Sequence, residues 1–245
     1  MNHQITTVQS TYAGKYFSIF GDSISTLEGC NPVGYSVFYT GLNCKRARVY
    51  TVEDTWWGQV IQQLGGQLLV NNAWSGSRVS QTPGREGLFP AGCSDERTSG
   101  LHTGTAAPDV IIVYLGINDY IGGCGGRSLT RSLFCSDMHY FGDAYFAMLE
   151  KLTRHYPQAE IWCCTLAPSS IAAYPEFVFP AEYEGRSAER FNDEIRGAAC
   201  HFGCRLLDLY AAQTPYDSID GTHPTRAGMA TLARIMLDCI GGDKA

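Results

Sequence analysis

Short apolar runs alternate along this chain with longer segments of helical periodicity, and no other feature constrains the fold as strongly. Four of the runs are rich in Val, Ile, Leu or Phe, as the buried strands of a parallel sheet are, and the last run is weaker. The pattern predicts βα units around one parallel sheet, which is an α/β fold. The expected strands are residues 16–20, 67–71, 110–115, 160–165 and 205–208.

Helical periodicity predicts the elements that connect and follow these strands. We expect Asp54 and Asp137 to cap the first two helices, and the pair Gly65-Gly66 to end the first one. The expected helices are residues 55–64, 138–155, 188–201 and 225–239.

Composition and charge narrow the class of protein. The chain has 245 residues, 44% hydrophobic and 17% charged, and it contains no linker-like segment, so one globular domain over residues 1–245 is expected. The net charge is −6 and the 18 Lys and Arg residues are scattered, which argues against a surface for nucleic acid or anionic lipid. No apolar run approaches the roughly 20 residues that cross a bilayer, and the first residues lack the apolar stretch of a signal peptide. We therefore expect a cytoplasmic protein without membrane insertion.

Ten cysteines are spread along the chain without a paired C-x-x-C signature. In the absence of an export signal, small, buried and reduced cysteines are expected rather than disulfides. Cys200 and Cys204 would share a helix face beside His201, so a soft-metal site is the less favoured alternative there.

The first candidate for chemistry is the segment Phe-Gly-Asp-Ser-Ile-Ser at residues 20–25, directly after the first expected strand. An open parallel sheet binds its ligands at the carboxyl ends of its strands. Gly21 lets the backbone turn sharply there, so Ser23 would stand at the rim as a candidate nucleophile. The alternative is a hydroxyl-rich loop that only caps a helix.

The second candidate is the segment Asp-Gly-Thr-His-Pro just before the last expected helix. Pro224 favours an extended backbone at His223 and itself suits the first turn of a helix. Across the glycine turn, Asp220 can accept the Nδ1 hydrogen of His223, which leaves Nε2 as a base. The alternative is an Asx-turn with an incidental histidine.

Two further strand ends can supply donors to an oxyanion. Asn118 follows the expected strand 110–115, and its amide is a donor that does not titrate. Gly76 follows the expected strand 67–71, where a backbone N–H can approach a ligand closely. Each residue alone would equally suit a turn. Together the four strand ends supply a nucleophile, a base with its orienting group, and two donors, which is the set that acyl transfer needs.

These blocks resemble those of the SGNH hydrolases, also called GDSL-type esterases, in order and spacing from Ser23 to His223. The resemblance implies a flavodoxin-like three-layer α/β/α sandwich with a short central parallel sheet. It implies that Ser23 attacks an ester carbonyl with Asp220 and His223 as the base pair. It also implies an oxyanion hole made by the N–H groups of Ser23 and Gly76 and the side chain of Asn118. A small-molecule ester is then the substrate, and no cofactor or metal is expected. The matching residues are Gly21-Asp22-Ser23-Ile24, Gly76, Gly116-x-Asn118-Asp119 and Asp220-x-x-His223.

Three other classes of function stay open at this point. Residues 23–26 resemble the hydroxyl-rich loop with which flavodoxins hold the FMN phosphate. The Asp-x-His spacing at residues 137–139 could join Asp22 and His223 as ligands of a metal-dependent phosphoesterase. A non-catalytic carbohydrate-binding domain of the same fold is the third alternative.

The substrate is the least constrained feature. Two long irregular stretches, residues 27–52 and 81–108, are expected to be functional loops, because loops of that length are uncommon in a compact domain. Aromatic side chains there and near the other strand ends suit sugar rings or an acyl chain, although loop packing is the first expectation. No long apolar lid is visible, so a short-chain ester is favoured, including an acetylated carbohydrate. Arg97 is expected to form a loop salt bridge rather than to bind substrate. The aromatic residues are Tyr35, Phe38, Tyr39, Trp74, Tyr120 and Phe134.

Overall fold

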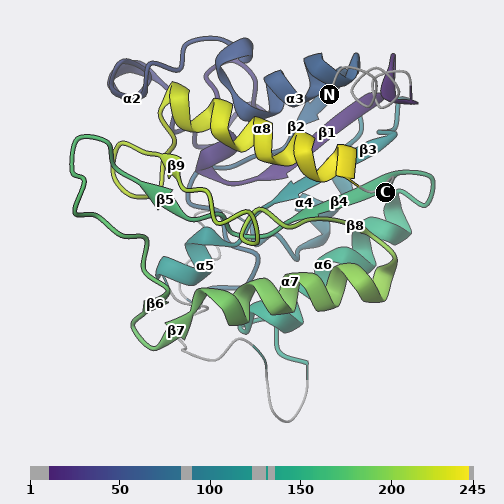
Figure 1. Cartoon of the computed structure of the whole chain (residues 1–245). Helices are drawn as coiled ribbons and strands as arrows, with labels where there is room; N and C mark the ends of the chain where they lie inside the picture. Colours follow the sequence, from purple (N-terminus) through teal and green to yellow (C-terminus); the bar gives the residue numbers. More distant parts are fainter. Residues whose placement is uncertain (1–10, 84–89, 123–130, 132–135, 243–245) are drawn as a thin grey trace.

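A central sheet of five parallel strands organises the molecule (Figure 1). The computed structural model describes residues 11–83, 90–122, 131 and 136–242. The strand order is β2-β1-β3-β4-β8, and every neighbouring pair is parallel. This confirms the α/β class and the short parallel sheet expected from the sequence. The strands are β1 (Tyr16–Gly21), β2 (Gln67–Asn71), β3 (Val110–Tyr114), β4 (Glu160–Cys164) and β8 (Arg205–Leu207).

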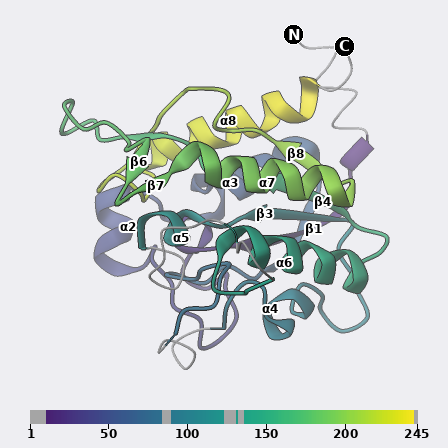
Figure 2. The ribbon, with the colours of Figure 1, turned by 90° about the horizontal axis from the view of Figure 1, so that it is seen from below.

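Helices cover both faces of the sheet, which makes the three layers of the sandwich. On one face α3 (Trp56–Leu64) packs against α8 (Arg226–Gly242). On the other face α6 (Phe141–His155) packs against α7 (Ala188–Phe202), as Figure 2 shows from below. The shorter elements are α2 (Gly41–Ala47), α4 (Asp95–Ser99), α5 (Ile117–Gly122), the 3₁₀ turns η1 (Ser23–Ser25) and η2 (Val52–Asp54), and the strand pairs β5 (Ser169–Ser170) with β9 (Tyr216–Asp217) and β6 (Glu182–Tyr183) with β7 (Arg186–Ser187).

From the topology, a ligand site is expected between β1 and β3. The chain runs from β1 to β2 on one side and then crosses to β3 on the other, so the strand order reverses at β1. In a doubly wound sheet, ligands bind outside the carboxyl ends of the strands at such a reversal. Gly21, the last residue of β1, is registered with Tyr114, the last residue of β3. The segments that follow these two residues carry Ser23 and Asn118.

Two of the expected helix caps are wrong, for a local reason in each case. Thr55, not Asp54, caps α3, because its Oγ1 accepts the N–H of Gly58 at 3.0 Å. Asp54 instead closes the preceding turn η2, where its carboxylate accepts the N–H of Thr51 in a capping box. The expected end of α3 is confirmed, since Gly65 adopts a left-handed φ of 72° there.

The start of α6 also differs from expectation. The helix begins at Phe141 with Tyr140 as its N-cap residue. Asp137 lies outside the helix, and its Oδ1 accepts hydrogen bonds from the backbone N–H and the Nδ1 of His139 at 2.9 and 2.7 Å. The carboxylate therefore stabilises a turn before the helix rather than the first turn of the helix itself.

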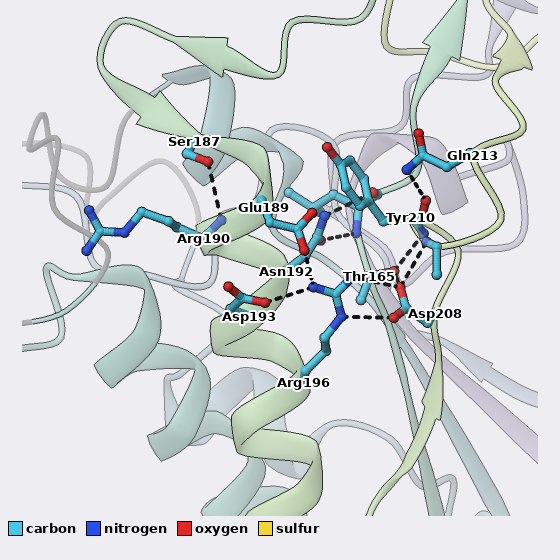
Figure 3. Close-up of polar contacts among 12 residues, drawn as sticks. Thr165, Ser187, Glu189, Arg190, Asn192, Asp193, Arg196, Asp208, Tyr210 and Gln213 are labelled. Atoms are coloured by element: carbon cyan, nitrogen blue, oxygen red, sulfur yellow. Dashed lines mark hydrogen bonds and ion pairs between the residues drawn. The ribbon is translucent and has the colours of Figure 1, made fainter.

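Polar side chains fix the ends of β4 and β8 and tie them to α7, as Figure 3 shows. Thr165 and Asp208 were expected as the last strand residues, but β4 ends at Cys164 and β8 at Leu207. The two side chains instead hydrogen-bond to each other at 2.9 Å. Arg196 of α7 donates to both carboxylate oxygens of Asp208, at 2.8 and 3.2 Å. Hydrogen bonds from Arg196 and Thr165 hold the pKa of Asp208 below its usual value, although burial alone would raise it.

The cysteines in the described part of the chain are free thiols, and many are buried; Cys124 and Cys135 lie outside the described residues. The expectation that Cys200 and Cys204 share a helix face is wrong, because α7 ends at Phe202 and Gly203 turns the chain with a left-handed φ of 65°. No described group of three His, Cys, Asp or Glu side chains is arranged to hold a metal ion. None of the helices in the described residues combines the length and apolarity needed to span a membrane.

Candidate active site

Ser23 lies on a sharp turn at the end of β1. The turn requires glycine at position 21. A Cβ built on Gly21 would lie 2.6 Å from the Oγ of Ser25 and 3.2 Å from the carbonyl oxygen of Tyr114. A side chain at position 21 would therefore collide with the following turn and with β3. The 3₁₀ turn η1 begins immediately, and Ser23 is its first residue with only 3% of its surface exposed.

The turn that carries Ser23 is held by its buried neighbour Asp22. The Oδ1 of Asp22 accepts the N–H of Ile24 at 3.0 Å and so caps η1. Burial raises the pKa of Asp22 to about 7, and the nearby Asp119 adds to the rise while Arg97 opposes it. Asp22 therefore acts as an internal cap for the turn.

Ser23, His223 and Asp220 form a continuous chain of hydrogen bonds. The Nε2 of His223 lies 2.9 Å from the Oγ of Ser23, and its Nδ1 lies 2.8 Å from the Oδ2 of Asp220. Burial by itself raises the pKa of Asp220, but hydrogen bonds from the side chain and backbone of His223 outweigh it and hold this pKa below its usual value. An ionised Asp220 can only accept, so Nδ1 must donate and Nε2 is left to accept the hydroxyl hydrogen of Ser23.

The turn that presents His223 is anchored by contacts from distant segments. Gly221 has a left-handed φ of 88°, and a Cβ there would lie 2.7 Å from the ring of Phe177. The Oγ of Ser169 donates to the carbonyl of Gly221 at 2.6 Å. The hydroxyl of Tyr39 donates to the carbonyl of Pro224 at 2.8 Å. The imidazole is therefore carried by a braced turn, as a base that must meet a fixed nucleophile requires.

The expected oxyanion donors lie on turns that are tied to one another. Gly76 has a left-handed φ of 82°, and the turn around it is joined to the end of β1 by a hydrogen bond from the N–H of Trp74 to the carbonyl of Gly21 at 3.1 Å. The Nδ2 of Asn118 donates to the carbonyl of Ser77 at 3.0 Å. This bond uses one of the two amide hydrogens and orients the group, and the second hydrogen has no acceptor among the described residues.

Asp119 fixes the relative position of these two turns. Its buried carboxylate accepts the N–H of Val79 at 2.8 Å and both the N–H and the hydroxyl of Ser80, at 3.0 and 2.5 Å. Burial raises the pKa of Asp119, and these hydrogen bonds oppose the rise. The carboxylate therefore joins the first turn of α5, which carries Asn118, to the loop after Gly76.

Arg97 does not form the loop salt bridge that was expected. Its side chain is completely buried, and the expectation of a loop salt bridge is wrong because its hydrogen-bond partners are neutral. The guanidinium donates to Asn72 and to the Oγ of Ser77, and one N–H reaches the carbonyl of Gly21 at 3.3 Å. Burial lowers the pKa of Arg97 to about 10. The side chain therefore joins the turn after β2 to the end of β1.

The aromatic residues near the site have different roles. The ring of Phe38 stacks on the imidazole of His223 with 3.5 Å between the ring centroids, and Tyr35 stacks on Trp74 at 4.0 Å. Tyr39 and Tyr120 are buried and donate to backbone carbonyls, so for them the expectation of loop packing is confirmed. Phe134 lies outside the described residues.

The geometry does not favour the FMN-binding alternative. A phosphate loop presents its hydroxyls to the ligand, whereas Ser25 and Thr26 are completely buried. The Oγ1 of Thr26 donates to the carbonyl of Ser23 at 2.9 Å, and the Oγ of Ser23 is engaged by His223. The hydroxyls of Ser23 and Thr26 are therefore committed to the imidazole and to the turn, and the hydroxyl of Ser25 is buried away from the surface.

The metal-dependent alternative lacks its ligand set in the described part of the chain. Asp137 and His139 hydrogen-bond to each other in the turn before α6, and Asp22 is committed to its own turn. His223 has its two ring nitrogens directed at Ser23 and Asp220.

Comparison with known proteins identifies the family of the chain. Residues 15–240 match the family described as GDSL-like Lipase/Acylhydrolase. No curated protein sequence matches the chain.

Among solved structures, a candidate GDSL-like lipase from Bacteroides uniformis is 26% identical, with a TM-score of 0.70 over 94% of this chain and 96% of the other. A candidate GDSL-like lipase from Bacteroides ovatus is 24% identical, with a TM-score of 0.67 over 92% and 97%. Est24, a carbohydrate acetylesterase from Sinorhizobium meliloti, is 16% identical, with a TM-score of 0.62 over 93% and 99%. The family match extends over nearly the whole sequence and includes all the segments that build the site, and the chain therefore belongs to the GDSL-like lipase/acylhydrolase family.

Proposed function

We propose that this protein is a serine esterase that hydrolyses carboxylic esters with short acyl chains through an acyl-enzyme on Ser23. The hydrogen-bond chain from Ser23 through His223 to Asp220 carries the proposal. A nucleophile, a base within hydrogen-bond reach and a group that orients the base are the elements that covalent acyl transfer requires.

The first half of the reaction follows from the positions of these atoms. As the Oγ of Ser23 attacks the ester carbonyl, the Nε2 of His223 takes the hydroxyl proton, and Asp220 stabilises the resulting imidazolium. The carbonyl oxygen becomes negatively charged and accepts hydrogen bonds from the N–H groups of Ser23 and Gly76 and from the amide of Asn118. The carbon–oxygen bond to the alcohol then breaks, and His223 returns the proton to the leaving alcohol.

The second half repeats these steps with water. His223 takes a proton from a water molecule, whose oxygen attacks the acyl carbon on Ser23. Breakdown of the second tetrahedral intermediate returns the proton to Ser23 and releases the acid. Every proton moves through the chain's own residues, so the proposed reaction requires no cofactor or metal.

An acetylated carbohydrate is the substrate that we propose for this site. Tyr35 and Trp74 stack with an interplanar angle of 27°, and Trp74 lies two residues before Gly76, so this half-buried aromatic pair borders the proposed oxyanion hole. Aromatic faces of this kind suit the apolar face of a sugar ring. The likeness to Est24, which is described as a carbohydrate acetylesterase, supports the same substrate class.

A panel of esters tests the proposed function. Purified protein should hydrolyse p-nitrophenyl acetate without added metal, and kcat/KM should fall as the acyl chain lengthens from acetate to palmitate. Acetylated sugars should release acetate, and Trp74→Ala should raise KM for them more than for p-nitrophenyl acetate, because only the sugar would use the aromatic pair. Long-chain esters as the best substrates would contradict the proposed acyl class. No hydrolysis of any ester would contradict the function and would favour a non-catalytic binding domain.

A further inference from the structure

Phe38 lies face to face with the histidine that serves Ser23. The two rings are nearly parallel, with an interplanar angle of 5° and centroids 3.5 Å apart. Phe38 is half-buried and belongs to the long loop before α2, far from His223 in the sequence. One face of the imidazole is therefore covered along its whole ring, while its two nitrogens remain in line with Ser23 and Asp220.

The Phe38 backbone is connected to the nucleophile through one buried hydroxyl. The Oγ1 of Thr26 accepts the N–H of Phe38 at 2.9 Å and donates to the carbonyl of Ser23 at 2.9 Å. The Nδ2 of Asn43 donates to the carbonyl of Phe38 at 3.1 Å. The ring of Tyr39 meets the Phe38 ring edge-on, with centroids 5.1 Å apart. The backbone of Phe38 is thus fixed by Thr26 and Asn43, and its ring packs against Tyr39.

A parallel stack of this kind is better suited to a charged imidazole than to a neutral one. Two neutral aromatic rings prefer offset or edge-to-face arrangements, because their faces are both electron-rich. An imidazolium is a cation, and the electron-rich face of a phenyl ring attracts a cation. The contact therefore becomes more favourable as His223 takes the proton of Ser23, which is the kind of interaction that accelerates a reaction.

We propose that Phe38 is a positioning residue for the esterase reaction: it holds the plane of the His223 ring and stabilises the imidazolium that forms during acyl transfer. This inference rests on the proposed function above. The phenyl ring has no proton to give and no charge, so its contribution passes entirely through His223.

Few other titratable groups face the imidazole, so the effect of Phe38 can be separated from theirs. Asp220 on the same loop carries the nearest charge. Tyr39 and Tyr216, which pack against this loop, have pKa values raised by burial and stay neutral at the pH of an assay. Asp22, which acts on Tyr39, and Asp217, which accepts from Thr225 on the same loop, are further acidic groups near this loop, and Ser23 contacts the ring directly. Substitution of Phe38 leaves all of these groups in place.

The test compares Phe38→Leu and Phe38→Tyr with the wild type. Leucine keeps an apolar side chain over the ring but removes the π-face, whereas tyrosine keeps the π-face. We expect Phe38→Leu to lower kcat for p-nitrophenyl acetate by about 3- to 30-fold with little change in KM, and Phe38→Tyr to restore most of it. Wild-type activity should fall toward acid pH as the ring takes up a proton, and in Phe38→Leu this acid limb should move to lower pH by about 0.4 to 1 unit.

Phe146→Leu is a matched control, because Phe146 also packs on a histidine, His201, at the surface of α6 and α7 and away from the site. It should change neither kcat nor the acid limb. An NMR titration of the His223 ring provides a readout that does not need activity: its Hε1 signal should lose an upfield ring-current shift in Phe38→Leu, and its titration should move to lower pH. If Phe38→Leu does not fold, Phe38→Met serves the same comparison.

The outcomes separate this inference from the proposed function. If the wild type hydrolyses esters but Phe38→Leu keeps its kcat, acid limb and NMR titration, Phe38 is only a packing residue. If the wild type hydrolyses no ester, the proposed function fails, and the NMR titration alone decides whether the phenyl ring stabilises the imidazolium.

Discussion

Ser23→Ala is expected to lower kcat for p-nitrophenyl acetate by about 10³-fold or more without loss of the fold. The change removes only the Oγ, which is the atom that meets the Nε2 of His223 at 2.9 Å. The backbone of the turn does not depend on this atom, because the carbonyl of Ser23 accepts from Thr26 and Asp22 caps the turn. Circular dichroism and thermal unfolding should therefore match the wild type, while steady-state kinetics show the loss.

Ser25→Ala is the matched control for this variant. Ser25 is also buried in η1, two residues from Ser23, and its Oγ has no hydrogen-bond partner among the described residues. Removing that hydroxyl should leave kcat within about twofold of the wild type, because a hydroxyl that contacts no reacting atom gives no differential stabilisation of the transition state. A Ser23→Ala protein that keeps a tenth of its activity, or a Ser25→Ala protein that loses as much as Ser23→Ala, would contradict the assignment of the nucleophile.

Asn118→Asp and Asn118→Ala are expected to lower kcat by about 10²- to 10³-fold with little change in KM. An oxyanion donor acts on the charge that develops in the transition state, so its loss affects kcat rather than substrate binding. Asn118→Asp keeps the shape but replaces a donor with a carboxylate. That carboxylate would face both the developing negative charge and the carbonyl of Ser77, to which Asn118 now donates. The Asp variant should therefore be at least as poor as the Ala variant.

The same variants distinguish a donor from a turn residue. Asp119 holds the turn to Val79 and Ser80 through its own carboxylate, so the local backbone does not rely on the side chain of Asn118. A turn residue at position 118 could be replaced by Asp with little effect. Activity of Asn118→Asp within about threefold of the wild type would mean that Asn118 only shapes the turn, and the oxyanion assignment would fail.

Much of the fold was predictable because its signal is local. The apolar runs that form β1 and β3 match the expected strands closely, since residues buried on both faces of a sheet are mostly apolar. The strand ends were less predictable where polar side chains form tertiary bonds. Thr165 and Asp208 bond to each other and so leave the ends of β4 and β8. The expected cap at Asp54 failed for a local reason, because Asp54 closes η2, a turn that the helical periodicity does not indicate.

The candidate site was predictable from chain spacing and from the geometry of parallel sheets. Asp220 and His223 are three residues apart across a glycine turn, and the structure joins them at 2.8 Å. Ser23 lies 200 residues from His223, and only the convergence of strand ends at one edge of the sheet could predict that they meet. Their catalytic roles, like those of Gly76 and Asn118, stay predictions until the variants are measured.

Other residues of the site could not be found in this way. Arg97 lies in a polar segment typical of an exposed loop, and its burial depends on the turns after β1 and β2 that surround its guanidinium. Phe38 reaches His223 from a long loop whose path no periodicity predicts. In both cases the information lies in tertiary contacts between loops, which short sequence patterns do not encode.

Trapping of the nucleophile by a small fluorophosphonate, followed by fragmentation mass spectrometry, tests the central claim most directly. The reagent should add once, on the Oγ of Ser23, and the fragments must distinguish Ser23 from the neighbouring hydroxyls of Ser25 and Thr26. Ser23→Ala should not be labelled. Both Asn118 variants should still be labelled, because their base is intact, but more slowly than the wild type, because one oxyanion donor is missing. Labelling of any other residue, or an active enzyme that the reagent neither labels nor inhibits, would contradict the central claim.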